Sequence, residues 1–308
     1  MPSVIEINHL YHVYAEGSPY EVEALRDITL SIEKGEFLGL FGPNGSGKST
    51  LVQHLNGLIK PQKGSVIVCG IDASDPKMSR DLWKKVGLVF QYPEHQIFQT
   101  TVFDEVAYGP RNLKLPEPEV KERVYEALEQ VGLTQENIAH LPPSTLSGGT
   151  RRRVAIAGLL AIRPEILILD EPMAGLDSAG RNLILEIIRK RQQRNETTIM
   201  VSHSLKEIMT LTDKLVILDS GSMVFTGTIK DLFNKPEILA RYHLELPDHL
   251  QVVYQIAAQG YEIKTNISSI QEAGEEIINL LKNRNALIRP GGTAEQRKER
   301  DAVNVFGQ

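Results

Sequence analysis

Short apolar runs separated by longer mixed segments dominate the hydrophobic pattern of this chain. The runs at residues 37–41, 86–90 and 166–169 have the length and composition of strands buried on both faces of a parallel sheet. Residues 198–201 and 215–218 repeat the pattern. Because helical segments separate the later runs, the sequence predicts a doubly wound α/β core.

Two segments depart from this pattern. From Val4 to Ile32, apolar and polar residues alternate around a break at residues 16–19, which predicts strands joined by a turn. From Pro93 to Leu146 the pattern becomes helical. One predicted helical face there carries Val120, Val124, Ala127 and Leu128. A helical insertion is therefore expected after Gln91.

Composition limits the classes of function. The chain has 308 residues, of which 41% are hydrophobic and 24% charged, as in an ordinary soluble globular protein. A net charge of −5 gives no overall basic field for nucleic-acid binding. Cys69 is the single cysteine, which excludes an internal disulfide. The N-terminus lacks signal-peptide features, and the longest clean apolar stretch, residues 154–162, is about half of a membrane span. Any work at a membrane is expected to need a partner protein.

A phosphate-binding pattern, G-x-x-x-x-G-K-[ST], occupies residues 42–49. It follows the apolar run 37–41 and precedes a segment without helix breakers, which is the strand–loop–helix context that this motif requires. Backbone N–H groups of such a loop and the N-terminus of the following helix bind phosphate. Lys48 is expected to reach the β- and γ-phosphates, and Ser49 to bind Mg²⁺. The alternative, a simple glycine-rich turn, does not account for this context. The chain is therefore expected to bind a nucleoside triphosphate.

Two carboxylates, Asp170 and Glu171, follow the apolar run 166–169. With a phosphate loop upstream, Asp170 is expected in the Mg²⁺ shell, and Glu171 is expected to point at the water that attacks the γ-phosphate. Taken alone, the same segment is equally typical of a strand that ends in two solvated acids.

Residues 146–150, Leu-Ser-Gly-Gly-Thr, are expected to begin a helix with a second anion-binding geometry, although Ser-Gly-Gly alone is also a flexible turn. Arg151, Arg152 and Arg153 follow, and positive charge there opposes the helix dipole. The arginines therefore need another partner, either an acidic surface or backbone carbonyl groups.

Taken together, these motifs resemble those of the ATP-binding cassette ATPases over residues 4–229. The resemblance implies a P-loop NTPase (RecA-like) α/β core with an N-terminal antiparallel β subdomain and an inserted α-helical subdomain. It further implies a glutamine loop at Gln91, a catalytic role for Glu171, a D-loop at residues 174–177 and a switch histidine at His203. Tyr14 stands where the family places an aromatic that stacks on adenine, with Tyr11 as the alternative. Thr150 stands where the family usually has a glutamine at the end of this segment. We expect the replacement to adjust the activity of the segment rather than abolish it.

The site residues that this family resemblance implies fall into three groups. The catalytic group is Glu171, His203 and Gln91, and the Mg²⁺ group is Ser49, Gln91 and Asp170. ATP is expected to contact Tyr14, Gly42, Pro43, Asn44, Gly45, Ser46, Gly47, Lys48, Ser49, Thr50, Ser147, Gly148 and Gly149. The last three would act on the nucleotide of a partner subunit.

A finer resemblance lies in residues 54–58, 90–98 and 106–112, which are similar to the ATPases of energy-coupling factor importers for cobalt, nickel or vitamins. It implies a translocase ATPase that is peripheral on the cytoplasmic side of the cell membrane. The implied partners are a second ATPase, in a homodimer or heterodimer, a transmembrane coupling subunit and a substrate-binding membrane subunit, with no nucleic acid. The implied domains are an ATPase domain at 1–230 (helical subdomain about 93–152), a small C-terminal extension at 231–289 and a disordered tail at 290–308.

Other functions fit these motifs less well. An exporter ATPase has the same core motifs, so they do not give the direction of transport. A soluble cassette acting on DNA or ribosomes usually has a coiled-coil insertion or two tandem cassettes, and a phosphate-loop kinase has no use for residues 146–150. The transported substrate is not encoded in this chain.

The C-terminal extension has weaker signals. Ser268 and Ser269 predict a capping box that opens a helix with Ile270, Ile277 and Leu281 facing inward.

Overall fold

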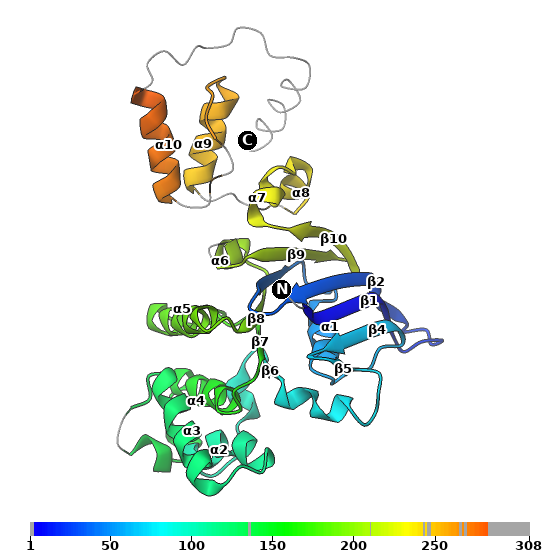
Figure 1. Ribbon diagram of the computed structural model, residues 1–308, viewed down its shortest axis with the longest axis vertical. Coiled ribbons are helices and arrows are strands. Elements are labelled where there is room, and N and C mark those ends of the chain that lie inside the picture. Colours follow the sequence, from blue (N-terminus) through cyan, green and yellow to red (C-terminus); the bar gives the residue numbers. More distant parts are fainter. Residues whose placement is uncertain are drawn as a thin grey trace. The chain divides into compact units, whose positions relative to one another are not determined.

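The computed structural model describes residues 3–134, 137–209, 211–242, 244, 248–264, 267 and 270–282. Its elements are shown in Figure 1. The chain divides into two compact units. The first comprises Met1–His203 and Val216–Thr226, and the second comprises Ser204–Leu215 and Gly227–Gln308.

A four-stranded antiparallel sheet forms the N-terminal part of the first unit, and the strands joined by a turn that residues 4–32 predict are two of its strands. Its strand order is β2-β1-β4-β5. The hairpin of β1 and β2 places Ile7 opposite Leu30 and Tyr14 opposite Val22. The strands are β1 (Ser3–Tyr14), β2 (Val22–Glu33), β4 (Lys63–Val68) and β5 (Ile71–Asp72). Apolar residues of this sheet share one buried core cluster with the helix α1 (Lys48–Leu55).

A second sheet has six strands in the order β10-β9-β3-β8-β7-β6. Its strands are β3 (Phe37–Phe41), β6 (Val86–Val89), β7 (Ile166–Asp170), β8 (Thr197–Ser202), β9 (Lys214–Asp219) and β10 (Ser222–Gly227). The pairs β3–β8, β8–β7 and β7–β6 are parallel, and β3, β6 and β8 are buried along their whole length. The buried parallel strands predicted at residues 37–41, 86–90, 166–169 and 198–201 are therefore confirmed, and the run 215–218 forms the buried strand β9 of the same sheet. Because the carboxyl ends of parallel strands meet at one edge, the loops after β3, β6, β7 and β8 converge there.

Helices complete the first unit. Its α-helices are α1, α2 (Val102–Asn112), α3 (Glu117–Gln130), α4 (Gly148–Leu160) and α5 (Ser178–Gln193). Short 3₁₀ turns lie at η1 (Ser79–Lys84), η2 (Pro93–Gln96), η3 (Ile138–His140) and η4 (Pro143–Thr145). Between β6 and β7 the chain forms the predicted helical insertion, in which α2 packs on α3 and α4, and α4 packs on η2. The predicted inner face of α3 is buried at Val120, Val124, Ala127 and Leu128.

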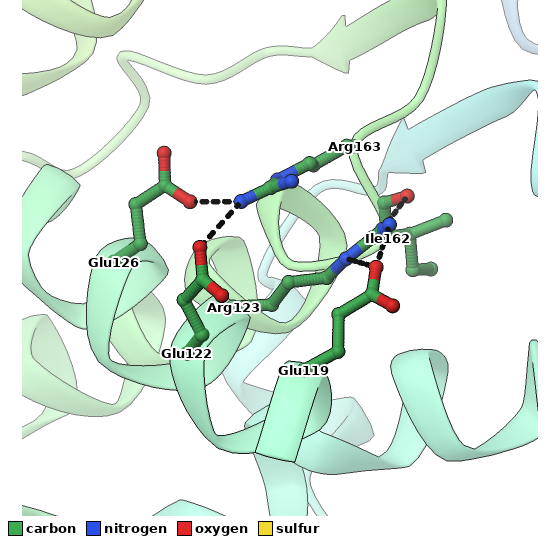
Figure 2. A network of polar contacts seen from close by, with 6 residues as sticks. All are labelled: Glu119, Glu122, Arg123, Glu126, Ile162 and Arg163. Atoms are coloured by element: carbon green, nitrogen blue, oxygen red, sulfur yellow. Dashed lines mark hydrogen bonds and ion pairs between the residues drawn. The ribbon is translucent and has the colours of Figure 1, made fainter. Parts of the chain in front are cut away.

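A polar network attaches α3 to the segment that leads from α4 into β7 (Figure 2). Arg163 donates to Glu126 at 2.5 Å, and Glu122 lies 4.0 Å from the same guanidinium group. Arg123 donates to the carbonyl oxygen of Ile162 at 3.3 Å. Partly exposed ion pairs contribute little stability one by one, but together these contacts fasten the insertion where it rejoins the sheet.

The second unit is helical. It contains α6 (Leu205–Met209), α7 (Ile229–Phe233), α8 (Pro236–Arg241), α9 (Asp248–Ala258) and α10 (Ile270–Lys282). The pairs α7–α8 and α9–α10 pack together. Among the described residues, no helix combines the length and hydropathy needed to cross a membrane.

The predicted C-terminal helix is α10, but two of the three residues predicted to face inward are exposed. Ile270 is 72% exposed and Leu281 is 68% exposed, whereas Ala273 is 2% exposed. Ile277, which is partly buried, follows Ala273 by one turn and lies on the same helical face. Among the described residues, α9 packs against α10. Ser268, Ser269 and residues 290–308 lie outside the described part of the chain.

Candidate nucleotide-binding site

The phosphate-loop motif forms the connection from β3 to α1. Gly47 is the N-cap of α1 and has φ +101°, a backbone conformation that side chains other than glycine rarely adopt. At Gly42, a Cβ atom would lie 2.2 Å from the carbonyl oxygen of Leu218, so only glycine fits this close approach. The glycines therefore shape the loop, and the backbone N–H groups at the start of α1 form the kind of site that binds phosphate.

Lys48 lies across this loop. Its Nζ donates to the carbonyl oxygens of Gly42 at 2.7 Å and Pro43 at 3.0 Å, and the residue is only 8% exposed. Burial lowers the pKa of Lys48, while the charges of Glu171 and Asp170 act in the opposite direction. A buried ammonium group whose hydrogen-bond partners among the described residues are neutral carbonyl groups would be stabilised by direct contact with phosphate oxygens.

Asp170 ends β7 beside the first turn of α1. The Ser49 hydroxyl donates to Asp170 Oδ2 at 3.5 Å. Burial raises the pKa of Asp170, as does the charge of Glu171, whereas Lys48 and the Ser49 hydrogen bond lower it. A hydroxyl and a carboxylate oxygen that face each other are hard ligands of the kind that Mg²⁺ prefers, and a bound Mg²⁺ would relieve the crowding of the two carboxylates. Gln91, exposed after the neighbouring strand β6, can add an amide oxygen. These residues fit the ion.

Glu171 and His203 form a directly bonded pair. Glu171 Oε1 lies 2.8 Å from His203 Nδ1 and also accepts the backbone N–H of His203 at 2.9 Å. The Glu171 backbone has φ +50°, and its N–H donates to the carbonyl oxygen of Val201 in β8. Each residue follows a neighbouring parallel strand, so the sheet brings together two groups that are 32 positions apart. The arrangement fixes the direction in which both side chains point.

Tyr14 reaches the same helix from β1. Its hydroxyl is hydrogen bonded to Thr50 Oγ1 at 3.3 Å, and the residue is 40% exposed. The structure thus places an accessible aromatic side chain next to the phosphate loop.

The Leu-Ser-Gly-Gly-Thr segment begins α4, as predicted. Ser147 is the N-cap, and its hydroxyl accepts the backbone N–H of Thr150 at 3.2 Å. Ser147, Gly148 and Gly149 are exposed, and open space surrounds the position of a Cβ atom at both glycines. Thr150 uses its hydroxyl locally, 2.9 Å from that of Ser147. The segment therefore exposes a helix N-terminus that carries no bulky side chain.

Of the three arginines that follow the Leu-Ser-Gly-Gly-Thr segment, Arg152 binds backbone carbonyl groups, which is one of the two alternatives left open for them. It is 4% exposed and donates to the carbonyl oxygens of Ala174 at 2.8 Å, Pro172 at 2.9 Å and Glu171 at 3.3 Å. Burial lowers the pKa of Arg152, and the charge of Glu94 opposes this. The guanidinium group ties α4 to the segment that follows the Glu171–His203 pair, a role that sequence reasoning did not assign to this residue.

Comparisons with known proteins agree with this geometry. A family model described as ABC transporter matches residues 25–174. The energy-coupling factor transporter ATP-binding protein EcfA2 of Caldanaerobacter subterraneus is 46% identical over 90% of this chain and 98% of the relative. Its counterpart in Clostridium perfringens is 43% identical over 91% of this chain and 99% of the relative.

Solved structures agree as well. CbiO1 from Clostridium perfringens, described as part of the ABC transporter complex CbiONQ, has a TM-score of 0.67 and 33% identity over 80% of this chain and 97% of that chain. A dimeric post-hydrolysis state of the ATP-binding cassette MJ0796, bound to ADP and Pi, has a TM-score of 0.65 and 28% identity over 73% of this chain and 98% of that chain. This chain belongs to the ABC transporter ATPases, among the ATP-binding proteins of energy-coupling factor transporters.

Proposed function

We propose that this chain is the ATP-hydrolysing subunit of a membrane importer of the energy-coupling factor type, peripheral on the cytoplasmic side. The observation that carries this proposal is the Glu171–His203 pair at the carboxyl edge of the sheet. Glu171 follows Asp170, which accepts a hydrogen bond from Ser49 next to Lys48, and in this proposal the pair faces the γ-phosphate. The importer would take up a cobalt or nickel ion or a vitamin, chosen by its membrane subunits.

Each residue of the site has a defined task in this proposal. Lys48 and the loop N–H groups bind the phosphates, and Tyr14 stacks on the adenine. Glu171 orients the attacking water and accepts its proton, while His203 holds Glu171 in place and contacts the γ-phosphate. Ser49, Asp170 and Gln91 would hold Mg²⁺, which supplies charge neutralisation between the β- and γ-phosphates when it is bound.

The exposed start of α4 supports a composite site in a dimer. Ser147, Gly148 and Gly149 present N–H groups and no bulky side chain to solvent. In the proposed dimer they close over the nucleotide of the partner, so that ATP binds the closed state more tightly than the open one. The EcfA2 and EcfA1 proteins of Caldanaerobacter subterraneus are 46% and 39% identical to this chain. Because one organism has both types, we favour a heterodimer with a second, homologous ATPase.

Exposed aromatic residues mark the proposed docking surface for the transmembrane coupling subunit. Val102 is fully buried and belongs to the core of the insertion, whereas Phe98 is 63% exposed and Tyr108 is 47% exposed. The Phe98 and Tyr108 rings meet edge to face with centroids 5.0 Å apart. An exposed aromatic pair of this kind suits the apolar face of a short helix.

Aspartate at this surface is expected to uncouple transport from hydrolysis. Phe98→Asp and Tyr108→Asp should abolish co-purification of the membrane partner, because docking would bury an unpaired charge. Basal ATPase activity of the isolated ATPase dimer should survive. Affinity purification and ATPase assays on the same preparations measure both effects.

Tyr20→Asp provides a matched control, since Tyr20 is 82% exposed in the β1–β2 loop. It should retain the membrane partner. Loss of basal activity together with a lower melting temperature in the Phe98 or Tyr108 variant would show that these residues belong to the core, and would refute the docking assignment.

A further inference from the structure

A buried histidine pair lies beneath Tyr14. The ring of His12 meets that of Tyr14 edge to face with centroids 4.5 Å apart, and it meets that of His54 in the same way at 4.9 Å. His54 is fully buried and His12 is 6% exposed, whereas Tyr14 is 40% exposed. The two histidine rings are therefore shielded from solvent, whereas the tyrosine ring is accessible.

Hydrogen bonds connect both Tyr14 and His54 to the same residue of α1, Thr50. The Tyr14 hydroxyl is bonded to Thr50 Oγ1 at 3.3 Å, and Nδ1 of His54 donates to the carbonyl oxygen of Thr50 at 2.8 Å. Thr50 follows Ser49 in the first turn of α1. The cluster thus fastens the end of β1 directly to the helix that begins with the phosphate loop.

Local structure explains how two distant segments meet in this cluster. A register shift between Ile7 and Leu10 interrupts the alternation of β1, so that Leu10 and His12 are the buried residues beyond it. The His12 and Tyr14 rings meet even though a register shift lies between His12 and Val13. Thr50 and His54 are four positions apart on α1 and share one helical face.

The histidine rings pack as aromatic groups. Burial lowers the pKa of both His12 and His54, which favours the uncharged imidazole. His12 Nδ1 is buried without a hydrogen-bond partner in the described part of the chain. His12 is therefore held by ring packing, which a phenylalanine ring could reproduce.

We propose that His12 and His54 are positioning residues for the nucleotide base. They hold the Tyr14 ring against the first turn of α1, so that the base stacks on a surface fixed relative to the phosphate loop. The proposal rests on the role of Tyr14 in ATP binding that is proposed above. A ring without this support would have to be ordered when ATP binds, and that ordering lowers affinity.

The two ends of ATP can be tested separately by titrating the full chain with ATP and with tripolyphosphate, which has no base. His12→Ala should weaken ATP binding about tenfold, within the range of one lost base–aromatic stack. Tripolyphosphate affinity should stay within about twofold, because the phosphate loop is intact. Tyr14→Ala should behave alike, and the double variant should lose little more than either single variant.

Two further variants distinguish a role in positioning the Tyr14 ring from a general loss of structure. His12→Phe keeps a ring at the site and should restore ATP affinity. His9→Ala changes an exposed histidine of the same strand, which is paired with Asp27 at 2.7 Å, and should change neither affinity. Parallel losses for ATP and tripolyphosphate, or additive effects of His12→Ala and Tyr14→Ala, would overturn the proposal. A wild-type chain that binds neither ligand would instead overturn the proposed function.

Discussion

Replacing Glu171 by glutamine will lower ATP turnover by roughly 10²–10⁴-fold and leave ATP binding close to that of the wild type. The amide keeps the shape of the side chain and can still bond to His203, whose Nδ1 lies 2.8 Å from Glu171 Oε1. It cannot accept the proton of the attacking water. Phosphate-release assays and ATP titrations on the same preparation measure the two quantities.

Glu165→Gln is the matched control for this prediction. Glu165 directly precedes β7, at the end opposite Glu171, and forms a partly exposed pair with Lys85. Its substitution should change turnover by less than about twofold, since exposed ion pairs contribute little. Near-full turnover in Glu171→Gln would refute the role of general base, whatever the binding data show.

Arginine at Ser147 will prevent ATP-dependent pairing of the subunits and leave ATP binding to the single subunit unchanged. Ser147 is exposed at the start of α4, and an arginine there adds bulk where the γ-phosphate of the partner should lie. Size-exclusion chromatography in the Glu171→Gln background, with and without ATP, measures the dimer fraction. If the chain pairs with a homologous ATPase, both chains must be present.

Loss of the N-cap could also weaken α4, by about 1 kcal/mol. Thermal melting of Ser147→Arg therefore accompanies the chromatography. Ser74→Arg introduces the same side chain at an exposed serine of the β subdomain and should leave the dimer fraction unchanged. Equal dimer fractions for Ser147→Arg and its parent would contradict the composite site.

Those parts of the site that are formed by consecutive residues could be predicted from the sequence. An apolar run followed by a glycine loop or by two acids indicates a buried strand that delivers its polar residues to one edge, as in β3 with Lys48 and β7 with Asp170. Parallel neighbours then bring His203 to Glu171. The roles assigned to these residues are still predictions, since geometry alone does not measure catalysis.

Contacts between distant segments could not be read from the sequence. Arg152 binds carbonyl groups about 20 positions away, and backbone carbonyls leave no trace in the amino-acid pattern. The only signal was a cation that opposes the helix dipole. His12 was missed because a register shift between Ile7 and Leu10 breaks the alternation on which strand faces are predicted. On α10, periodicity identified the helix, but the partner helix α9 decides which apolar residues are buried.

The central claim is that this chain powers transport by hydrolysing ATP at the site around Lys48. The most direct test is ATP hydrolysis by the transporter complex purified with its membrane subunits, for the wild type and for Lys48→Ala. Because the Lys48 ammonium group is buried in the loop and positioned for phosphate, we expect hydrolysis in the wild-type complex and background activity in the variant. Equal hydrolysis by the two complexes, or purification of a wild-type chain without membrane subunits, would contradict the account.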